Sequence, residues 1–152
     1  FVMHNFVEID DPAKAEEWTL DKLKNKELVM GFGHRVYKKG DSRVPTMEAC
    51  FKKLAAEHEA KDPNKGAAKW VEIYDIMAKT MYDNTSIHIM PNLDFPAGPA
   101  YYILGFDIEF FTPLFVMARI TGWTAHIIEQ YSNPTIIRPL AAYNGPDERH
   151  VR

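Results

Sequence analysis

The feature that most limits the fold of this chain is the helical spacing of its apolar residues. From residue 67 onward, large apolar side chains recur every three or four positions: Trp70, Ile73, Tyr74, Met77 and Met81. This period places them on one face of an α-helix, which is best explained as part of the core. Alternating β-branched segments, which would predict strands, are almost absent. The sequence therefore predicts an all-α fold.

Helix-start signals precede this helix. Asp11 followed by Pro12 is typical of an N-cap and a first helical residue, and Pro45 marks another helix start. Five residues are expected to lie on one side of the helix that begins at Pro45: Met47, Cys50, Phe51, Leu54 and His58. Residues 1–9 have the pattern of the middle of an amphipathic helix, so we expect the chain to be cut from something longer.

Prolines and glycines divide the second half of the chain. Residues 90–100, MPNLDFPAGPA, contain three prolines and one glycine and are expected to interrupt the helices. A long apolar helix is expected from Ile108 to about Thr121. Gly122 should kink or end it, and a further helix should reach about Tyr131. The tail beyond residue 131 holds three more prolines and is expected to be irregular.

Composition excludes several classes of protein. A length of 152 residues suits one domain, and a net charge of −3 provides no global basic field for nucleic acid. Apolar runs stay short of the roughly 20 residues that span a bilayer, so no membrane partner is expected. The single cysteine, Cys50, excludes an internal disulfide and favours a reducing, cytoplasmic compartment. Cys50 itself is best explained as a small core residue.

The segment VMGFGHRVYKKGDSR, residues 29–43, is the first candidate for chemistry. Gly31 and Gly33 permit positive φ and let a ligand approach backbone N–H groups, and His34 follows them directly. The segment also has basic residues that could meet phosphates: Arg35, Lys38 and Lys39. The alternative is a helix-ending glycine turn with a solvated basic surface, and the pattern alone leaves the two interpretations about even.

Asp94, within NLDFPAG, is the second candidate. Its apolar neighbours, such as Leu93 and Phe95, would raise its proton affinity and suit a general base. The alternative is that Asp94 caps a helix expected to begin near Pro96. The pattern alone favours the cap.

Arginines form the third group of candidates. Arg119 lies in FFTPLFVMARITGW, a helix that is otherwise apolar on every face. Burying its guanidinium without a partner would be very costly, so we expect a carboxylate partner from a ligand or from Asp107 or Glu129. Arg43 and Arg138 lie near prolines that fix the local backbone. Taken alone, either would be interpreted as a surface arginine. The histidines form no persuasive metal-ligand pair, so no metal is expected.

Four ordered segments resemble the citrate synthase family: GFGHRVYKKGDSR, NLDFPAG, LFVMARITGWTAHIIEQ and IIRP. The resemblance covers nearly the whole chain, which is similar to the C-terminal part of a family subunit. The sequence of these segments looks most like that of the bacterial 2-methylcitrate synthase branch. The resemblance implies that residues 1–105 belong to the small, CoA-binding and catalytic domain. Residues 106–152 would then supply C-terminal helices and the tail of the large domain.

The resemblance also implies roles for individual residues. The family condenses an acyl-CoA with oxaloacetate and hydrolyses the thioester, without a permanently bound cofactor. Asp94 would take the α-proton of the acyl-CoA, and His34 would polarise the oxaloacetate carbonyl. Oxaloacetate would be bound by Arg43, Phe115, Arg119 and, in the partner subunit's site, Arg138. CoA would be contacted by Val29, Met30, Gly31, Phe32, Gly33, Arg35, Lys38 and Lys39.

Two further expectations come from the resemblance. The role of Arg138 implies a homodimer or a higher homo-oligomer. The family has another histidine, in a Leu-His-Gly-Gly segment expected just upstream of Phe1. His4 is not its equivalent, because no Gly-Gly follows it. This polypeptide alone is therefore expected to be inactive.

These residues leave four interpretations of function open. The leading one is an acyltransferase that makes 2-methylcitrate from propionyl-CoA, oxaloacetate and water, and that also accepts acetyl-CoA. Plain citrate synthase of the tricarboxylic acid cycle is the nearest alternative, because one methylene in an apolar pocket is worth only about 1–3 kcal/mol. A third interpretation, from another class of function, is a non-catalytic helical module that binds CoA or a protein. The fourth is a purely structural fragment that folds only with its missing half.

Overall fold

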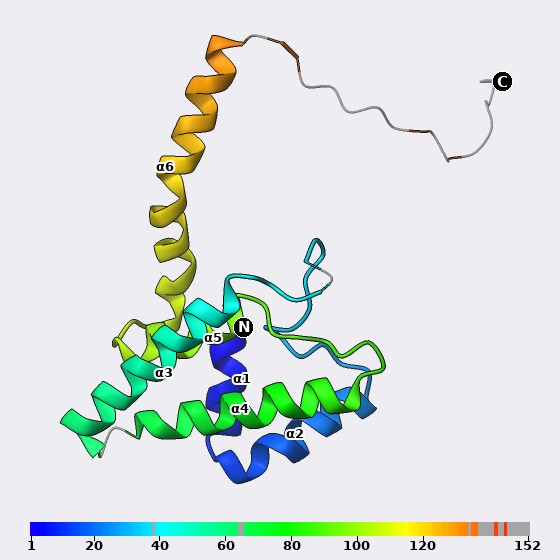
Figure 1. Cartoon of the computed structure of the whole chain (residues 1–152), viewed down its shortest axis with the longest axis vertical. Coiled ribbons are helices and arrows are strands. Elements are labelled where there is room, and N and C mark those ends of the chain that lie inside the picture. Colours follow the sequence, from blue (N-terminus) through cyan, green and yellow to red (C-terminus); the bar gives the residue numbers. More distant parts are fainter. Residues whose placement is uncertain (38, 64–65, 134, 137–141, 143–144, 146–152) are drawn as a thin grey trace, which may run out of the picture. The chain divides into compact units, whose positions relative to one another are not determined.

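The computed structural model describes residues 1–37, 39–63, 66–133, 135–136, 142 and 145 (Figure 1). Two of the predicted site residues, Lys38 and Arg138, lie outside this part of the chain. The helices are α1 (Val2–Ile9), α2 (Pro12–Lys24), α3 (Val44–Lys61), α4 (Ala67–Asn84), α5 (Asp94–Ile103), the short 3₁₀ helix η2 (Ile108–Phe110) and α6 (Phe111–Ser132). The described residues contain no strand, so the all-α prediction is confirmed.

The chain divides into two compact units, residues 1–114 and 115–152. Within the described residues, every buried hydrophobic side chain belongs to the first unit. Its largest fully buried aromatic residues are Phe6, Phe51, Tyr74 and Phe95. The predicted face of α4 is confirmed, because Trp70, Ile73, Tyr74, Met77 and Met81 are all buried.

Helix packing inside the first unit brings distant segments together. In Figure 1, α2 runs along α4, while α3 packs against both α4 and α5, and α1 against α5. The Asp11 carboxylate accepts a hydrogen bond from the Ala13 backbone at 3.0 Å, which confirms the predicted N-cap of α2. The start of α2 is therefore set by its local sequence, as predicted.

Phe95 anchors the start of α5 in this core. Its ring centroid lies 4.4 Å from that of Phe32, 4.5 Å from Tyr74 and 5.4 Å from Phe6. Contacts of this kind add to the burial of the ring itself. The first turn of α5 is thus held against α1, α4 and the loop before α3.

Three local predictions were wrong. Helix α5 begins at Asp94, not near Pro96, because a proline in the first turn lacks only an N–H that would be unpaired there anyway. Gly122 does not end a helix, since α6 is continuous from Phe111 to Ser132, whereas the alternative of a kink at Gly122 stays a prediction. Cys50 is exposed, and the buried residues of α3 are Val44, Phe51 and Ala55.

Helix α6 has an unusual surface for its composition. Many of its large apolar side chains are exposed, and none of its residues is buried. Among the described residues, no helix is both long enough and apolar enough to cross a bilayer.

Candidate active site

The glycine-histidine loop and the segment before α5 are joined by backbone hydrogen bonds. The Gly33 N–H donates to the Met90 carbonyl at 2.9 Å, and the Asn92 N–H donates to the Gly31 carbonyl at 2.8 Å. These bonds flank an antiparallel bridge between Phe32 and Pro91. Two of the segments that the sequence singles out, joined here by contacts that span 57 to 61 residues of the chain, therefore form one small substructure.

Gly31 is required at its position for two reasons. Its φ is +93°, and a Cβ placed there would lie 2.8 Å from Cδ2 of Phe95. Side-chain-bearing residues rarely adopt this φ, and the contact is shorter than real Cβ atoms allow. Gly31 and Gly33 both adopt the positive φ that glycine permits, and at Gly31 the space is filled by the protein's own core.

His34 is held by the backbone of its own turn. Its Nδ1 atom accepts hydrogen bonds from the Val36 N–H at 3.0 Å and from the Tyr37 N–H at 3.1 Å. An imidazole nitrogen that accepts is unprotonated, so a neutral ring carries its proton on Nε2. The half-buried ring thus has Nε2–H as a hydrogen-bond donor, which is the group needed to polarise a carbonyl.

Asp94 occupies the first position of α5, and its side chain is exposed. Both expectations about its surroundings were wrong. Its neighbours Phe95 and Pro96 are buried, but they point into the core and do not enclose the carboxylate. Asp94 makes no side-chain cap either; instead, the Asn92 Oδ1 accepts the Asp94 backbone N–H at 3.0 Å.

Arg43 is oriented by Asp41. The guanidinium donates from Nε to Oδ1 of Asp41 at 2.8 Å and from Nη2 to Oδ2 at 2.7 Å, and the Arg43 backbone N–H donates to Oδ1 at 3.1 Å. Such a two-point contact fixes the plane of the guanidinium. Asp41 therefore limits the orientation in which the Arg43 guanidinium can contact a ligand.

Electrostatics links this pair to the start of α5. The hydrogen bond from Arg43 holds the pKa of Asp41 well below its usual range, with a smaller contribution from the Leu93 backbone. Asp41 in turn raises the pKa of Arg43, and Asp94 makes a weaker contribution in the same direction. Arg43 therefore lies within electrostatic reach of both Asp41 and Asp94.

Sequence reasoning missed Asp41 and Asn92 as site residues. Asp41 was visible as the first residue of the Asp-x-Arg pattern, and Asn92 as the first residue of NLDFPAG. Neither pattern shows that the side chains join segments distant in the sequence.

The remaining predicted CoA contacts are distributed over the same loop. Val29 is buried in the core cluster, and Phe32 packs partly buried against it. Met30, Arg35 and Lys39 are exposed. The loop therefore combines an anchored apolar side with exposed basic groups.

Two of the predicted residues that the structure describes lie in the second unit. The Arg119 Cζ is 4.7 Å from the ring centroid of Phe115, one turn earlier on α6, and both side chains are exposed. The expected burial of Arg119 was wrong, because no residue of α6 is buried. Glu129, suggested as its carboxylate partner, lies 3.2 Å from Nδ1 of His126. The contact with Phe115 is a cation–π interaction.

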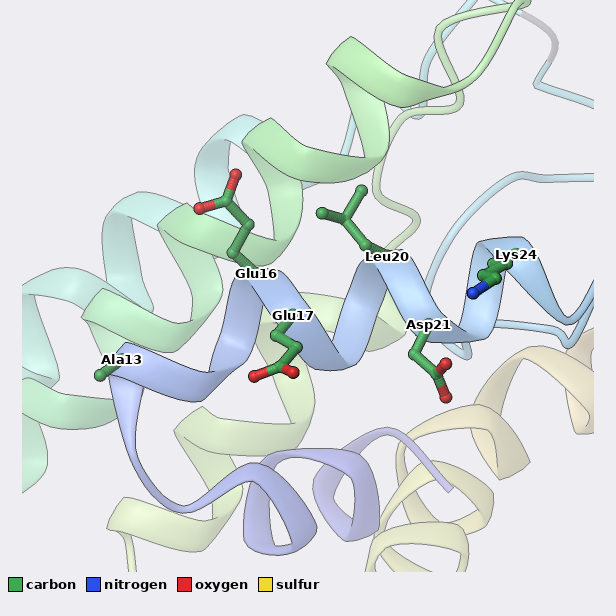
Figure 2. Close-up of a pocket in the computed structure, with 6 residues that line it drawn as sticks. All are labelled: Ala13, Glu16, Glu17, Leu20, Asp21 and Lys24. Atoms are coloured by element: carbon green, nitrogen blue, oxygen red, sulfur yellow. The ribbon is translucent and has the colours of Figure 1, made fainter.

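A shallow hollow elsewhere on the first unit contains none of these residues. Figure 2 shows that the side chains lining it all come from α2: Ala13, Glu16, Glu17, Leu20, Asp21 and Lys24. It is an open surface on one helix without converging groups. The described residues also contain no cluster of three potential metal ligands. The candidate site therefore remains the His34 loop and the segment before α5 that is hydrogen-bonded to it.

Comparison with known proteins decides the family. Residues 1–140 match the family described as citrate synthase, C-terminal domain. This chain belongs to the citrate synthase family. The match confirms the resemblance and agrees with the all-α fold.

Individual relatives of this citrate synthase family member cover nearly all of it. It is 58% identical over 151 residues to 2-methylcitrate synthase 2 of Corynebacterium glutamicum, covering 99% of this chain and 37% of the relative. It is 52% identical over 150 residues to citrate synthase of Mycolicibacterium smegmatis, covering 99% and 38%.

A solved structure gives the same result. Citrate synthase from Thermoplasma acidophilum, in a ternary complex with carboxymethyl coenzyme A and oxaloacetate, matches with a TM-score of 0.77 and 37% identity. The match covers 99% of this chain and 39% of that one. The chain therefore spans well under half the length of the relatives that it matches.

Proposed function

We propose that this chain supplies the base and the carbonyl-polarising donor of an enzyme that condenses an acyl-CoA with oxaloacetate, of the 2-methylcitrate synthase type. One observation carries the proposal: hydrogen bonds join the His34 loop to the segment that opens α5 at Asp94. A proton acceptor and a hydrogen-bond donor are thereby held in one substructure. Membership of the citrate synthase family supports condensation as the reaction of this pair.

The chemistry divides between the two groups. The Asp94 carboxylate removes a proton from the carbon next to the thioester carbonyl. That proton is far less acidic than a carboxylic acid, so the developing enolate also needs a donor at the thioester oxygen. The family resemblance assigns that donor to the Leu-His-Gly-Gly histidine, outside this chain.

His34 acts on the second substrate. Its Nε2–H donates to the keto oxygen of oxaloacetate, which draws electron density from the carbon that the enol attacks. A carbon–carbon bond forms, the keto oxygen becomes a hydroxyl, and water then cleaves the thioester to release CoA. The net reaction consumes propionyl-CoA, oxaloacetate and water and yields 2-methylcitrate and CoA.

The arginines suit the carboxylates of oxaloacetate. A planar guanidinium matches a carboxylate with two parallel hydrogen bonds. Arg43 is oriented by Asp41 for such a contact, and Arg119, with Phe115 beside it, is its proposed counterpart in the second unit. Arg138 is proposed to serve the same site of a partner subunit in a homodimer or higher oligomer. The exposed basic residues Arg35 and Lys39 are proposed to meet CoA phosphates.

The acyl preference is proposed from the relatives. The 58% identical relative is named a 2-methylcitrate synthase, while the 52% identical one is named a citrate synthase. We propose propionyl-CoA as the preferred substrate and acetyl-CoA as a second one. We also propose that residues 1–105 belong to the small domain and residues 106–152 to the large domain.

The test uses the protein expressed from its complete coding sequence. Condensation is followed by release of the free CoA thiol, with propionyl-CoA and acetyl-CoA compared by kcat/KM. Asp94→Asn and His34→Ala should each lower kcat by about 10²–10⁴-fold, the usual contribution of a positioned acid or base.

Matched controls make the same chemical changes at exposed sites. Asp83→Asn on α4 and His4→Ala on α1 should leave the rates unchanged. Full condensation activity in both Asp94→Asn and His34→Ala would overturn the proposal. Binding of CoA without any condensation would instead support a non-catalytic module.

A further inference from the structure

One side chain, Asn92, connects the backbones of the two proposed catalytic residues. Its Nδ2 donates to the carbonyl of Gly33 at 2.9 Å, which is the peptide group that leads directly into His34. Its Oδ1 accepts the backbone N–H of Asp94 at 3.0 Å. The two ends of a single amide thus contact the peptide before His34 and the first residue of α5.

The backbone of Asn92 reinforces this connection. Its N–H donates to the Gly31 carbonyl at 2.8 Å, and its carbonyl accepts the Phe95 N–H at 3.1 Å. Asn92 is partly buried, so its hydrogen bonds compete only in part with water. The residue is therefore bonded on both sides of the junction by backbone and by side chain.

Only a side chain with a donor and an acceptor on one short arm can make both contacts. An asparagine amide offers two N–H donors and one carbonyl acceptor. An aspartate keeps the acceptor for the Asp94 N–H but places a negative oxygen against the Gly33 carbonyl. An alanine makes neither contact.

We propose that Asn92 is a positioning residue that sets the orientation of His34 relative to Asp94 in the condensation step. The proposal rests on the proposed function. Because Asn92 acts through the two reacting groups, its loss should lower kcat more than it changes KM. A displacement of about 1 Å in a reacting group can cost about 10²-fold in rate.

The experiment compares Asn92→Asp and Asn92→Ala in the protein expressed from its complete coding sequence. Both variants should lower kcat by about 10–100-fold, with the KM for oxaloacetate changed by less than about threefold. Asn84→Asp is the matched control, because the Asn84 Nδ2 also donates to a backbone carbonyl, that of Thr80, at 2.9 Å. The kcat of this control should stay within about twofold of the parent value, because the Asn84 hydrogen bond does not position a proposed catalytic residue.

A spectroscopic readout separates positioning from mere folding. The infrared stretching frequency of the keto group of bound, isotope-labelled oxaloacetate reports how strongly His34 polarises it. Asn92→Asp removes the contact on the His34 side, so the frequency should shift back toward that of free oxaloacetate. Asn84→Asp should leave it unchanged.

Asn92→Gln keeps both hydrogen-bonding groups on a longer arm and serves where the other variants fold poorly. It should recover part of the kcat lost in Asn92→Ala. Unchanged kcat and carbonyl frequency in folded Asn92 variants would overturn the positioning role, as would a rise in KM alone. The proposed function fails separately, if Asp94→Asn and His34→Ala retain full activity.

Discussion

The carboxylate of Asp41 accepts three hydrogen bonds from Arg43, two from the guanidinium and one from the backbone N–H. The exposed fractions of the two side chains differ sharply, at 1% for Asp41 and 44% for Arg43. The negative end of the pair is thus buried, while the positive end faces outward. This arrangement presents an oriented cation at the surface, next to the segment that carries Asp94.

The first prediction concerns stability in acid. The pKa of Asp41 is below its usual value of 3.8 in the folded protein, chiefly because of the hydrogen bond from Arg43. A depressed carboxyl pKa contributes stability that is complete above the unfolded pKa and is lost as the pH falls through the folded one. Asp41→Asn should therefore unfold at lower urea concentration at pH 7, but lose less stability than the parent between pH 4 and pH 2.5.

Urea unfolding followed by tryptophan fluorescence at pH 7, 5, 4, 3 and 2.5 measures this dependence. The slope of stability against pH should become shallower by at most the equivalent of one proton. Asp83→Asn, an exposed change on α4, controls for the loss of one carboxylate. Parallel pH curves for the parent and Asp41→Asn would contradict the prediction.

The second prediction concerns the close approach of Gly31 to the core. Gly31→Ala places a Cβ 2.8 Å from Cδ2 of Phe95 and 3.1 Å from Cγ2 of Val2, at a φ of +93°. The left-handed backbone costs about 1–2 kcal/mol for a residue with a side chain, and overpacking adds about 1–3 kcal/mol. We expect the free energy of unfolding to fall by roughly the sum.

Gly105→Ala is the control for the backbone contribution. Gly105 has a similar φ of +87°, but nothing lies within 4 Å of a Cβ built there. This variant should lose only about 1–2 kcal/mol. Equal losses in denaturant unfolding of the two variants would show that Gly31 and Phe95 are not in contact.

The third prediction concerns Phe95 itself. This fully buried ring contacts aromatic rings from three other segments of the first unit. Phe95→Ala should lower the free energy of unfolding by about 3–5 kcal/mol, as is usual for removal of a buried phenyl ring. Because Phe95 follows Asp94 directly, kcat should also fall in molecules that remain folded. Equilibrium unfolding and single-turnover kinetics measure the two effects.

Ile87→Ala provides the comparison for Phe95. Ile87 is 78% exposed, so its truncation should change the free energy of unfolding by no more than about 0.5 kcal/mol. A loss at Phe95 as small as the loss at Ile87 would rule out the aromatic cluster as the anchor of α5.

The fourth prediction concerns the two compact units. The buried hydrophobic residues of the described chain all precede residue 115. A polypeptide ending at Leu114 should therefore unfold cooperatively, with a helical circular dichroism spectrum. Its denaturant midpoint should match that of the 152-residue chain within error. A non-cooperative transition would mean that residues after 114 are needed for the core.

Local sequence signals predicted much of this fold. The three-to-four-residue spacing of α4 and the Asp-Pro start of α2 each depend on neighbouring residues alone, and both were confirmed. Gly31 and Gly33 were also seen to permit a positive φ, which both adopt. The same local reasoning was wrong for Cys50, because adjacent positions at the edge of a helical face differ in burial according to what packs there.

The candidate site was predictable in part. The motif segments pointed to His34, Asp94 and Arg43, but not to the residues that join them. Asn92 contacts Gly33 across 59 positions of sequence, a separation that no local pattern encodes. Asp94 was expected among apolar groups, yet the packing of Phe95 turns the apolar side of α5 inward and leaves the carboxylate exposed.

By itself, the sequence determined the helices, the glycine turn and the family, because each depends on residue types at short spacing. The tertiary structure alone decided that Asn92 joins the His34 turn to the start of α5, and that the Leu93 backbone meets Asp41 there. The physical reason is that hydrogen bonds and ring contacts require particular distances and directions. Those become defined only when the helices pack around Phe95 and bring segments distant in the chain together.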